Sequence, residues 1–144
     1  MDDVHYYTAS VTWKNGRIGE LAEEGFPSIE VATPPEFPGG VPNIWSPEHL
    51  YVASAVVCLM TTFCAIAENS NLSFSSFSCT GKGKLEKVER AFMITQIELM
   101  PVIKVPDERS GERAQRIIEK SERACLISNS MKSEIILKPD IIIG

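Results

Sequence analysis

Apolar residues at the start of the chain alternate with polar ones over short stretches. From His5 to Lys14 the alternation is moderate, with Tyr7, Ala9, Val11 and Trp13 on one face, a pattern typical of a half-buried strand. Asn15-Gly16 follows, and this dipeptide favours a two-residue hairpin turn. We therefore expect Arg17–Leu21 to return as a second strand, and Ser28–Ala32 to form a third short strand.

A proline-rich segment interrupts this alternation. Residues 33–42 contain four prolines and two glycines, which exclude regular structure and predict a stiff loop. So long a loop within a compact domain is usually functional or covers another part of the fold. Helix signals come next, because Ser46 is a hydroxyl cap, Pro47 suits the first helical position and Glu48 favours the positive end of the helix dipole.

The predicted helix extends to about Asn69, and residues 50–67 carry no charge. Its length approaches the lower limit for a membrane span, which is the alternative interpretation. However, this segment is the one candidate span found, it lacks basic flanks, and the segments around it have strand patterns. We therefore favour a helix that is buried on nearly all sides. A domain of this size has few ways to surround a helix, so we expect a second subunit to cover part of it.

The second half of the chain predicts two long strands, a helix and a last strand. Leu72–Val88 and Phe92–Val105 are the strands, with a bulge expected near Ser75-Ser76, where the alternation changes parity, and Pro101 expected at a sheet edge. An amphipathic helix over Arg109–Ala124 and a strand over Glu134–Leu137 complete the order. This order predicts an α+β fold, and the length of 144 residues predicts a single domain over residues 1–144.

Charge and cysteine content narrow the class of protein. The 15.9 kDa chain has a formal net charge of −5, which argues against binding to nucleic acid or to an anionic membrane surface. Four cysteines without a CxxC pair or a Cys/His cluster predict neither a disulfide scaffold nor a zinc site. The acidic start lacks the order of a signal peptide, so we expect a cytoplasmic protein in a reducing compartment.

Two of the cysteines are candidates for chemistry. Cys58 lies in the middle of the apolar helix and Cys125 lies at the end of the amphipathic one. The competing interpretation is that both only pack, because free cysteines are often buried as small apolar residues. Cys64 and Cys79 are interpreted as packing residues, and His49 as a solvated residue of the first helical turn.

Three motifs, in this order and spacing, resemble the OsmC/Ohr family of hydroperoxide-reducing proteins. Residues 46–58, SPEHLYVASAVVC, are similar to the family's helix with an NPE start and a later cysteine. Residues 124–130, ACLISNS, are similar to its CPxSN turn, with Leu126 where the family has proline. Residues 15–19, NGRIG, are similar to its early Gly-Arg-x-Gly turn.

The resemblance implies a cysteine-based peroxidase with an OsmC-like fold, in which antiparallel sheets surround the central helix of an intertwined homodimer. It implies that the Cys58 thiolate attacks an organic hydroperoxide, that Cys125 resolves the resulting sulfenic acid to a disulfide, and that an external, lipoyl-type dithiol recycles it. No metal, flavin or haem is required. Apolar neighbours, namely Leu59, Met60, Phe63 and Phe37, suggest a preference for organic hydroperoxides over hydrogen peroxide, which stays a second substrate.

Two charged residues complete the implied site. A guanidinium near the sulfur stabilises a thiolate, and Arg17 is the candidate, held by a carboxylate pair with Glu48. Ten residues of helix separate Glu48 from Cys58 by about 15 Å, so we expect Glu48, with Arg17, to come from the partner subunit of a homodimer. The alternatives are an OsmC-like dimer that binds or senses ligands without turnover, and a structural protein whose cysteines only pack.

Overall fold

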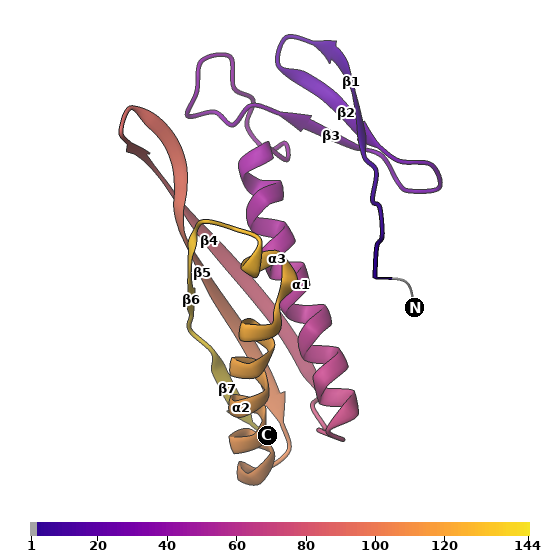
Figure 1. Cartoon of the computed structure of the whole chain (residues 1–144), viewed down its shortest axis with the longest axis vertical. Coiled ribbons are helices and arrows are strands. Elements are labelled where there is room, and N and C mark those ends of the chain that lie inside the picture. Colours follow the sequence, from indigo (N-terminus) through magenta and orange to yellow (C-terminus); the bar gives the residue numbers. More distant parts are fainter. Residues whose placement is uncertain (1–2) are drawn as a thin grey trace. The chain divides into compact units, whose positions relative to one another are not determined.

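The computed structural model describes residues 3–144 and divides the chain into two compact units, one up to Leu50 and one from Tyr51 to Gly144 (Figure 1). Each unit is described by itself. The predicted α+β class is confirmed, since helices separate runs of two or three consecutive strands, with seven strands and three helices in the described chain. The single domain expected over residues 1–144 stays a prediction.

The N-terminal unit is a three-stranded antiparallel sheet. Its strands are β1 (Ser10–Asn15), β2 (Ile18–Ala22) and β3 (Ile29–Ala32), in that order. The predicted hairpin is confirmed, because Asn15 pairs with Ile18 and the left-handed φ of 52° at Gly16 suits glycine. β1 starts at Ser10 rather than at His5, because Ser10 already pairs with Ala22, the last residue of β2.

The proline-rich segment forms the predicted irregular loop. The Val41 N–H donates to the Thr33 carbonyl, which closes the loop across residues 33–41. The Ala32 N–H donates to the Trp45 carbonyl and thereby holds the chain that leads into α1 (Pro47–Asn69) beside β3. Pro47 is the first residue of this helix, as the capping signals predict.

The sheet of the second unit is mixed rather than wholly antiparallel. β4 (Ser76–Val88) pairs antiparallel with β5 (Ala91–Val105) in one long hairpin. β6 (Glu134–Leu137) and β7 (Asp140–Ile143) then pair with successive parts of β5, both in parallel orientation. The apolar tail after Pro139 is thus an additional strand that the sequence pattern did not predict.

Two predictions about this hairpin are wrong. The bulge expected near Ser75-Ser76 is absent from the described pairing, whose register shifts between Lys84 and Leu85 instead. The parity changes near Ser75 because β4 begins only at Ser76, so the residues before it do not belong to the strand. Pro101 lies in the central strand β5, not at an edge, and falls between the residues that pair with β6 and those that pair with β7.

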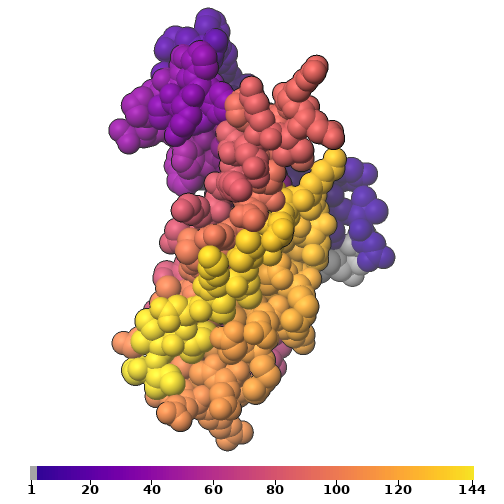
Figure 2. Space-filling model, turned by 90° about the vertical axis from the view of Figure 1, so that its left-hand side faces the viewer, coloured from indigo at the N-terminus to yellow at the C-terminus, as the bar shows by residue number. Residues whose placement is uncertain are grey.

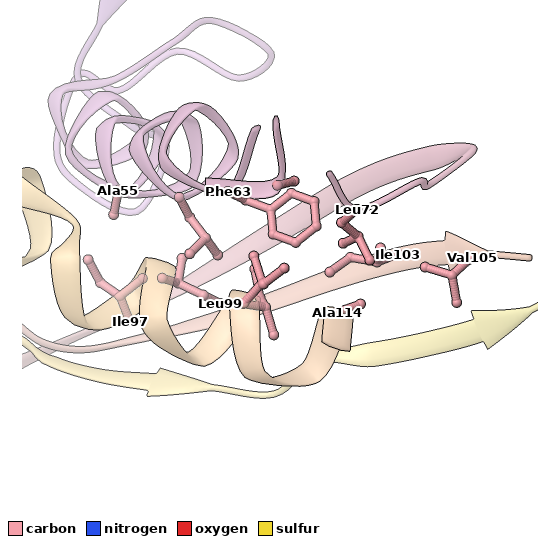
Figure 3. Packing of buried hydrophobic residues seen from close by; sticks show 12 residues of the cluster. Ala55, Phe63, Leu72, Ile97, Leu99, Ile103, Val105 and Ala114 are labelled. Carbon is pink, nitrogen blue, oxygen red and sulfur yellow. The ribbon is translucent and has the colours of Figure 1, made fainter. Parts of the chain in front are cut away.

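Two helices cover one face of this sheet. Alternate residues of β5 from Ile97 to Val105 are buried against α1 and against α2 (Glu108–Ala124), which is the predicted amphipathic helix (Figure 3). The yellow strand β7 lies next to orange α2 in the view of Figure 2, and Gly111 of α2 faces Ile141 and Ile143. A short third helix, α3 (Leu126–Asn129), follows directly after α2.

The apolar helix α1 is buried on one side only within this chain. Its inward face consists of Ala55, Cys58, Leu59, Phe63 and Ala67. Its outward face leaves Val57 53% and Met60 41% exposed. The expectation that the helix is buried on nearly all sides therefore does not hold for one chain alone. The helix is long and apolar enough to cross a membrane by length and composition, but its inward face forms the core on this sheet.

Candidate functional site

Cys58 lies at the border between the buried and the exposed side of α1. It is 8% exposed, whereas the neighbouring Leu59 is completely buried in the core. One turn further along the helix, Thr62 places its Oγ1 3.8 Å from the Cys58 Sγ. The sulfur is therefore close to the surface and has a polar neighbour on its own helix.

Cys125 lies at the junction between α2 and α3. Its backbone N–H donates to the Glu122 carbonyl at the end of α2, and its carbonyl accepts from Asn129 in α3. The side chain is completely buried, and the Ser128 hydroxyl donates to its Sγ over 3.5 Å. Both cysteines are free thiols in this structure.

The fold brings these two thiols together within one chain. Hydrogen bonding from the Cys125 thiol and from the backbone N–H groups of Ile127 and Leu126 lowers the pKa of the Cys58 thiol. Helix α3 thus offers its first two N–H groups, which lack partners within the helix, to the sulfur on α1. Two residues far apart in the sequence therefore form one dithiol.

The two thiols differ in acidity. Burial raises the pKa of Cys58, but the hydrogen bonds from Cys125, Ile127, Thr62 and Leu126 outweigh burial and lower it below that of an ordinary cysteine. Burial raises the pKa of Cys125, and its hydrogen bond to Cys58 raises it further. The first proton therefore leaves Cys58, while Cys125 stays a thiol and stabilises the thiolate.

Arg17 belongs to the N-terminal unit and is the second residue of the two-residue turn between β1 and β2. Its side chain lies across the proline-rich loop. A β-carbon at Gly39 would be 3.1 Å from the Arg17 Cγ and 3.4 Å from its Nε, so the absence of a side chain at Gly39 lets the Arg17 side chain lie against the loop backbone. The arginine is exposed and makes no ion pair with Glu48 in the part of the chain that the structure describes.

Glu48 lies in the first turn of α1 and is partly buried. Its Oε1 atom is buried without a hydrogen-bond partner among residues 3–144. Burying a carboxylate oxygen without a hydrogen-bond donor costs free energy, and residues 3–144 provide no donor to this atom. The predicted pairing of Glu48 with Arg17 is therefore not formed within one chain.

The structure adds site residues that the sequence reasoning missed. Thr62 could have been found, because a residue four positions after Cys58 lies on the same helical face. Ser128 had a similar signal three positions after Cys125. The N–H groups of Leu126 and Ile127 carry no side-chain signal at all. Within residues 3–144 no cluster of three or more His, Cys, Asp or Glu side chains could hold a metal ion.

Comparison with solved structures finds proteins with a similar fold. An OsmC-like protein from Vibrio cholerae shares 21% identity and a TM-score of 0.85, over 94% of this chain and 99% of that one. An organic hydroperoxide resistance protein from Elizabethkingia anophelis shares 24% identity and a TM-score of 0.78, with both chains covered completely. Another, from Bacillus subtilis, shares 22% identity and a TM-score of 0.64, over 94% of this chain and 98% of that one.

The structural likeness establishes the fold, and the sequence establishes the family. A search among curated proteins finds no match to this sequence. The family described as OsmC-like protein matches residues 40–140, which include the proline-rich loop, α1 and both candidate cysteines. This chain therefore belongs to the OsmC-like protein family.

Proposed function

We propose that this protein is a thiol-dependent peroxidase that reduces organic hydroperoxides in the cytoplasm. The observation that carries the proposal is the dithiol of Cys58 and Cys125, in which one pKa is lowered and the other raised. A thiolate is the nucleophile toward a peroxide, and a nearby thiol can close a disulfide. The hydroperoxide resistance proteins among its structural relatives support the substrate class.

In the first step, the Cys58 thiolate attacks an oxygen of the substrate ROOH. The O–O bond breaks, the alkoxide leaves with a proton as ROH, and Cys58 becomes a sulfenic acid. The donors that stabilise the thiolate sulfur are in place around Cys58. Arg17 is the proposed cation that stabilises the thiolate further and polarises the peroxide.

In the second step, the Cys125 thiol attacks the sulfenic sulfur of Cys58. The S–S bond forms, the S–O bond breaks and water leaves, so one substrate molecule consumes both thiols. An external dithiol of the lipoyl type then reduces the disulfide by exchange. The cycle draws its electrons from thiols alone, so its chemistry calls for neither a metal nor a flavin.

The preference for organic hydroperoxides depends on the surface next to Cys58. Leu59 and Phe63 are completely buried in the core and are therefore unable to line a substrate site. Val57 and Met60 are the apolar residues of α1 that face outward beside the cysteine. We therefore assign the contact with the organic group of the substrate to this outward face.

The same outward face is the proposed contact with a second copy of the chain. The uncharged part of α1, residues 50–67, exposes Val57 and Met60, and strand β1 exposes Val11 and Trp13. A dimer would remove such apolar surface from water. The unpartnered Oε1 of Glu48 adds a polar reason, because Arg17 of the partner subunit would supply the missing donor. A monomer in sedimentation at micromolar concentration contradicts this arrangement.

Stopped-flow measurement with cumene hydroperoxide tests the proposed function. We expect wild-type protein to consume peroxide and lose two thiols, Cys58→Ser to consume none, and Cys125→Ser to react once and leave a sulfenic acid that dimedone traps. Cys64→Ser is the matched control, because this exposed cysteine of the same helix should leave the reaction unchanged. Undiminished consumption by Cys58→Ser refutes the peroxidase. Reversible Cys58 oxidation without turnover would favour a redox sensor.

A further inference from the structure

A junction of three elements lies two helical turns before Cys58. Ser133 is buried, with 7% of its surface exposed, and its hydroxyl donates to the Ile94 carbonyl of β5. Its oxygen is 2.8 Å from the hydroxyl of Tyr51 on α1. Because the Ser133 proton goes to Ile94, Tyr51 is the donor in its bond with Ser133. This junction joins helix α1, strand β5 and the segment of residues 125–133, which contains α3.

That segment carries the resolving thiol. Cys125 stands at its start and Ser133 at its end, immediately before β6. The backbone hydrogen bonds between them are local, such as Asn129 N–H to the Cys125 carbonyl and Met131 N–H to the Ser128 carbonyl. Local bonds shape the segment but do not fix its distance from α1. Packing of Met131 on the core and the tie at Ser133 do so.

The tie at Ser133 connects directly to the helix that bears the peroxidatic sulfur. Tyr51 and Cys58 are seven residues apart, which places them on the same face of α1 about 10 Å apart along the axis. Opposite them, Ser133 and Cys125 stand at the two ends of one segment. The segment is thus held against α1 at Tyr51 and meets the sulfur at Cys58.

We propose that Tyr51, acting through Ser133, is a positioning residue that holds Cys125 within reach of Cys58. The inference rests on the proposed role of Cys125 as the resolving thiol. When Cys58 is oxidised, the α3 segment must bring Cys125 onto the Cys58 sulfur, and a segment tied at Ser133 has fewer arrangements to search. Loss of the phenolic hydroxyl therefore slows disulfide closure and leaves the reactivity of Cys58 unchanged.

The test uses 5,5′-dithiobis(2-nitrobenzoate), which separates the two events without any peroxide. The Cys58 thiolate displaces a first thionitrobenzoate anion and forms a mixed disulfide. The Cys125 thiol then attacks the Cys58 sulfur, loses its proton, forms the S–S bond and releases a second anion. A Cys64→Ser, Cys79→Ser background removes the other two thiols, so the two releases report on Cys58 and Cys125 alone.

We expect Tyr51→Phe to slow the second release about fivefold, the effect of about one hydrogen bond on the closed arrangement, and to leave the first release unchanged. Ser133→Ala should behave alike, and the double variant should be no slower than either single variant. Ser133→Thr keeps the hydroxyl and should restore closure. Ser54→Ala is the matched control, since it removes a hydrogen bond to the Tyr51 carbonyl but keeps the phenolic link.

Two results overturn the inference. Equal second-release rates in wild type, Tyr51→Phe and Ser133→Ala show that the junction does not position Cys125. A wild-type chain that releases only one anion shows that Cys125 is not within reach at all. The proposed function fails separately, when disulfide closure is rapid with this reagent but the protein consumes no hydroperoxide.

Discussion

The backbone N–H of Leu126 gives the sharpest test of how the site makes Cys58 acidic. This N–H is one of the donors that lower the pKa of the Cys58 thiol. Leu126→Pro removes the donor and little else, because the Leu126 side chain is 68% exposed. Leu126 is also the first residue of α3, where proline is favoured. The preceding Cys125 has φ −67° and ψ 110°, an extended conformation that a following proline tolerates.

The size of the effect follows from the charge on the acceptor. A hydrogen bond to a charged group contributes about 1.5 kcal/mol or somewhat more, and about 1.4 kcal/mol corresponds to one pKa unit. Leu126 is the weakest of the four donors to Cys58, so we expect Leu126→Pro to raise the pKa of Cys58 by at most about one unit. Below that pKa the thiolate fraction falls by at most about tenfold, and because the more basic thiolate is up to about threefold more nucleophilic, the peroxide reaction slows by at most about threefold.

The assay is the pH dependence of Cys58 alkylation by iodoacetamide, read by mass spectrometry of the Cys58 peptide. Leu126→Ala is the matched control, because it shortens the same side chain but keeps the N–H, and its titration should match that of wild type. An unchanged Cys58 titration in Leu126→Pro, with far-ultraviolet circular dichroism and oligomeric state preserved, refutes the assignment of this N–H as a donor.

Three further predictions follow from the geometry. Thr62→Val removes a hydroxyl 3.8 Å from the Cys58 sulfur without changing the side-chain shape, so the Cys58 pKa should rise in the alkylation assay. Thr61→Val is the control, because the Thr61 hydroxyl donates to the Cys58 carbonyl and its loss should leave the Cys58 pKa unchanged. Equal titrations in both variants contradict the role of Thr62. Gly81→Ala would place a β-carbon 2.5 Å from the Val56 Cγ2, so the free energy of unfolding in urea should fall by about 1–3 kcal/mol, and an unchanged midpoint argues against this close helix–sheet packing. The rate of the peroxide reaction should rise with pH through the Cys58 pKa. Because that pKa is lowered, the half-maximal rate should lie at a lower pH than the titration midpoint of a free cysteine in a model peptide, and a midpoint above that of the peptide contradicts the donor set.

The sequence predicted those elements whose signals are local. The hydroxyl cap, proline and acid at residues 46–48 predict the start of α1 at Pro47, and Asn15-Gly16 predicts the first hairpin. Pairing between distant segments carries no such signal. The register shift therefore lies at Lys84 rather than near Ser75, and strand β7 was missed because only its pairing with β5 makes the apolar tail a strand.

In the candidate site, too, the sequence predicted the individual residues better than the contacts between them. Cys58 and Cys125 were found through motifs that resemble one family, since composition alone favours packing for both. Their contact depends on how α3 meets α1, which side-chain spacing does not encode. Arg17 and Glu48 form no ion pair in the part of the chain that the structure describes, and the contact between subunits that we propose for them has no local sequence signal.

The most direct test of the dithiol is a mass spectrum of the wild-type protein after one equivalent of cumene hydroperoxide, digested under conditions that block free thiols. We predict one disulfide within the chain, between Cys58 and Cys125, with Cys64 and Cys79 recovered as thiols. Cys58 recovered as sulfinic or sulfonic acid beside a free Cys125, or oxidation confined to Cys64, would contradict the account.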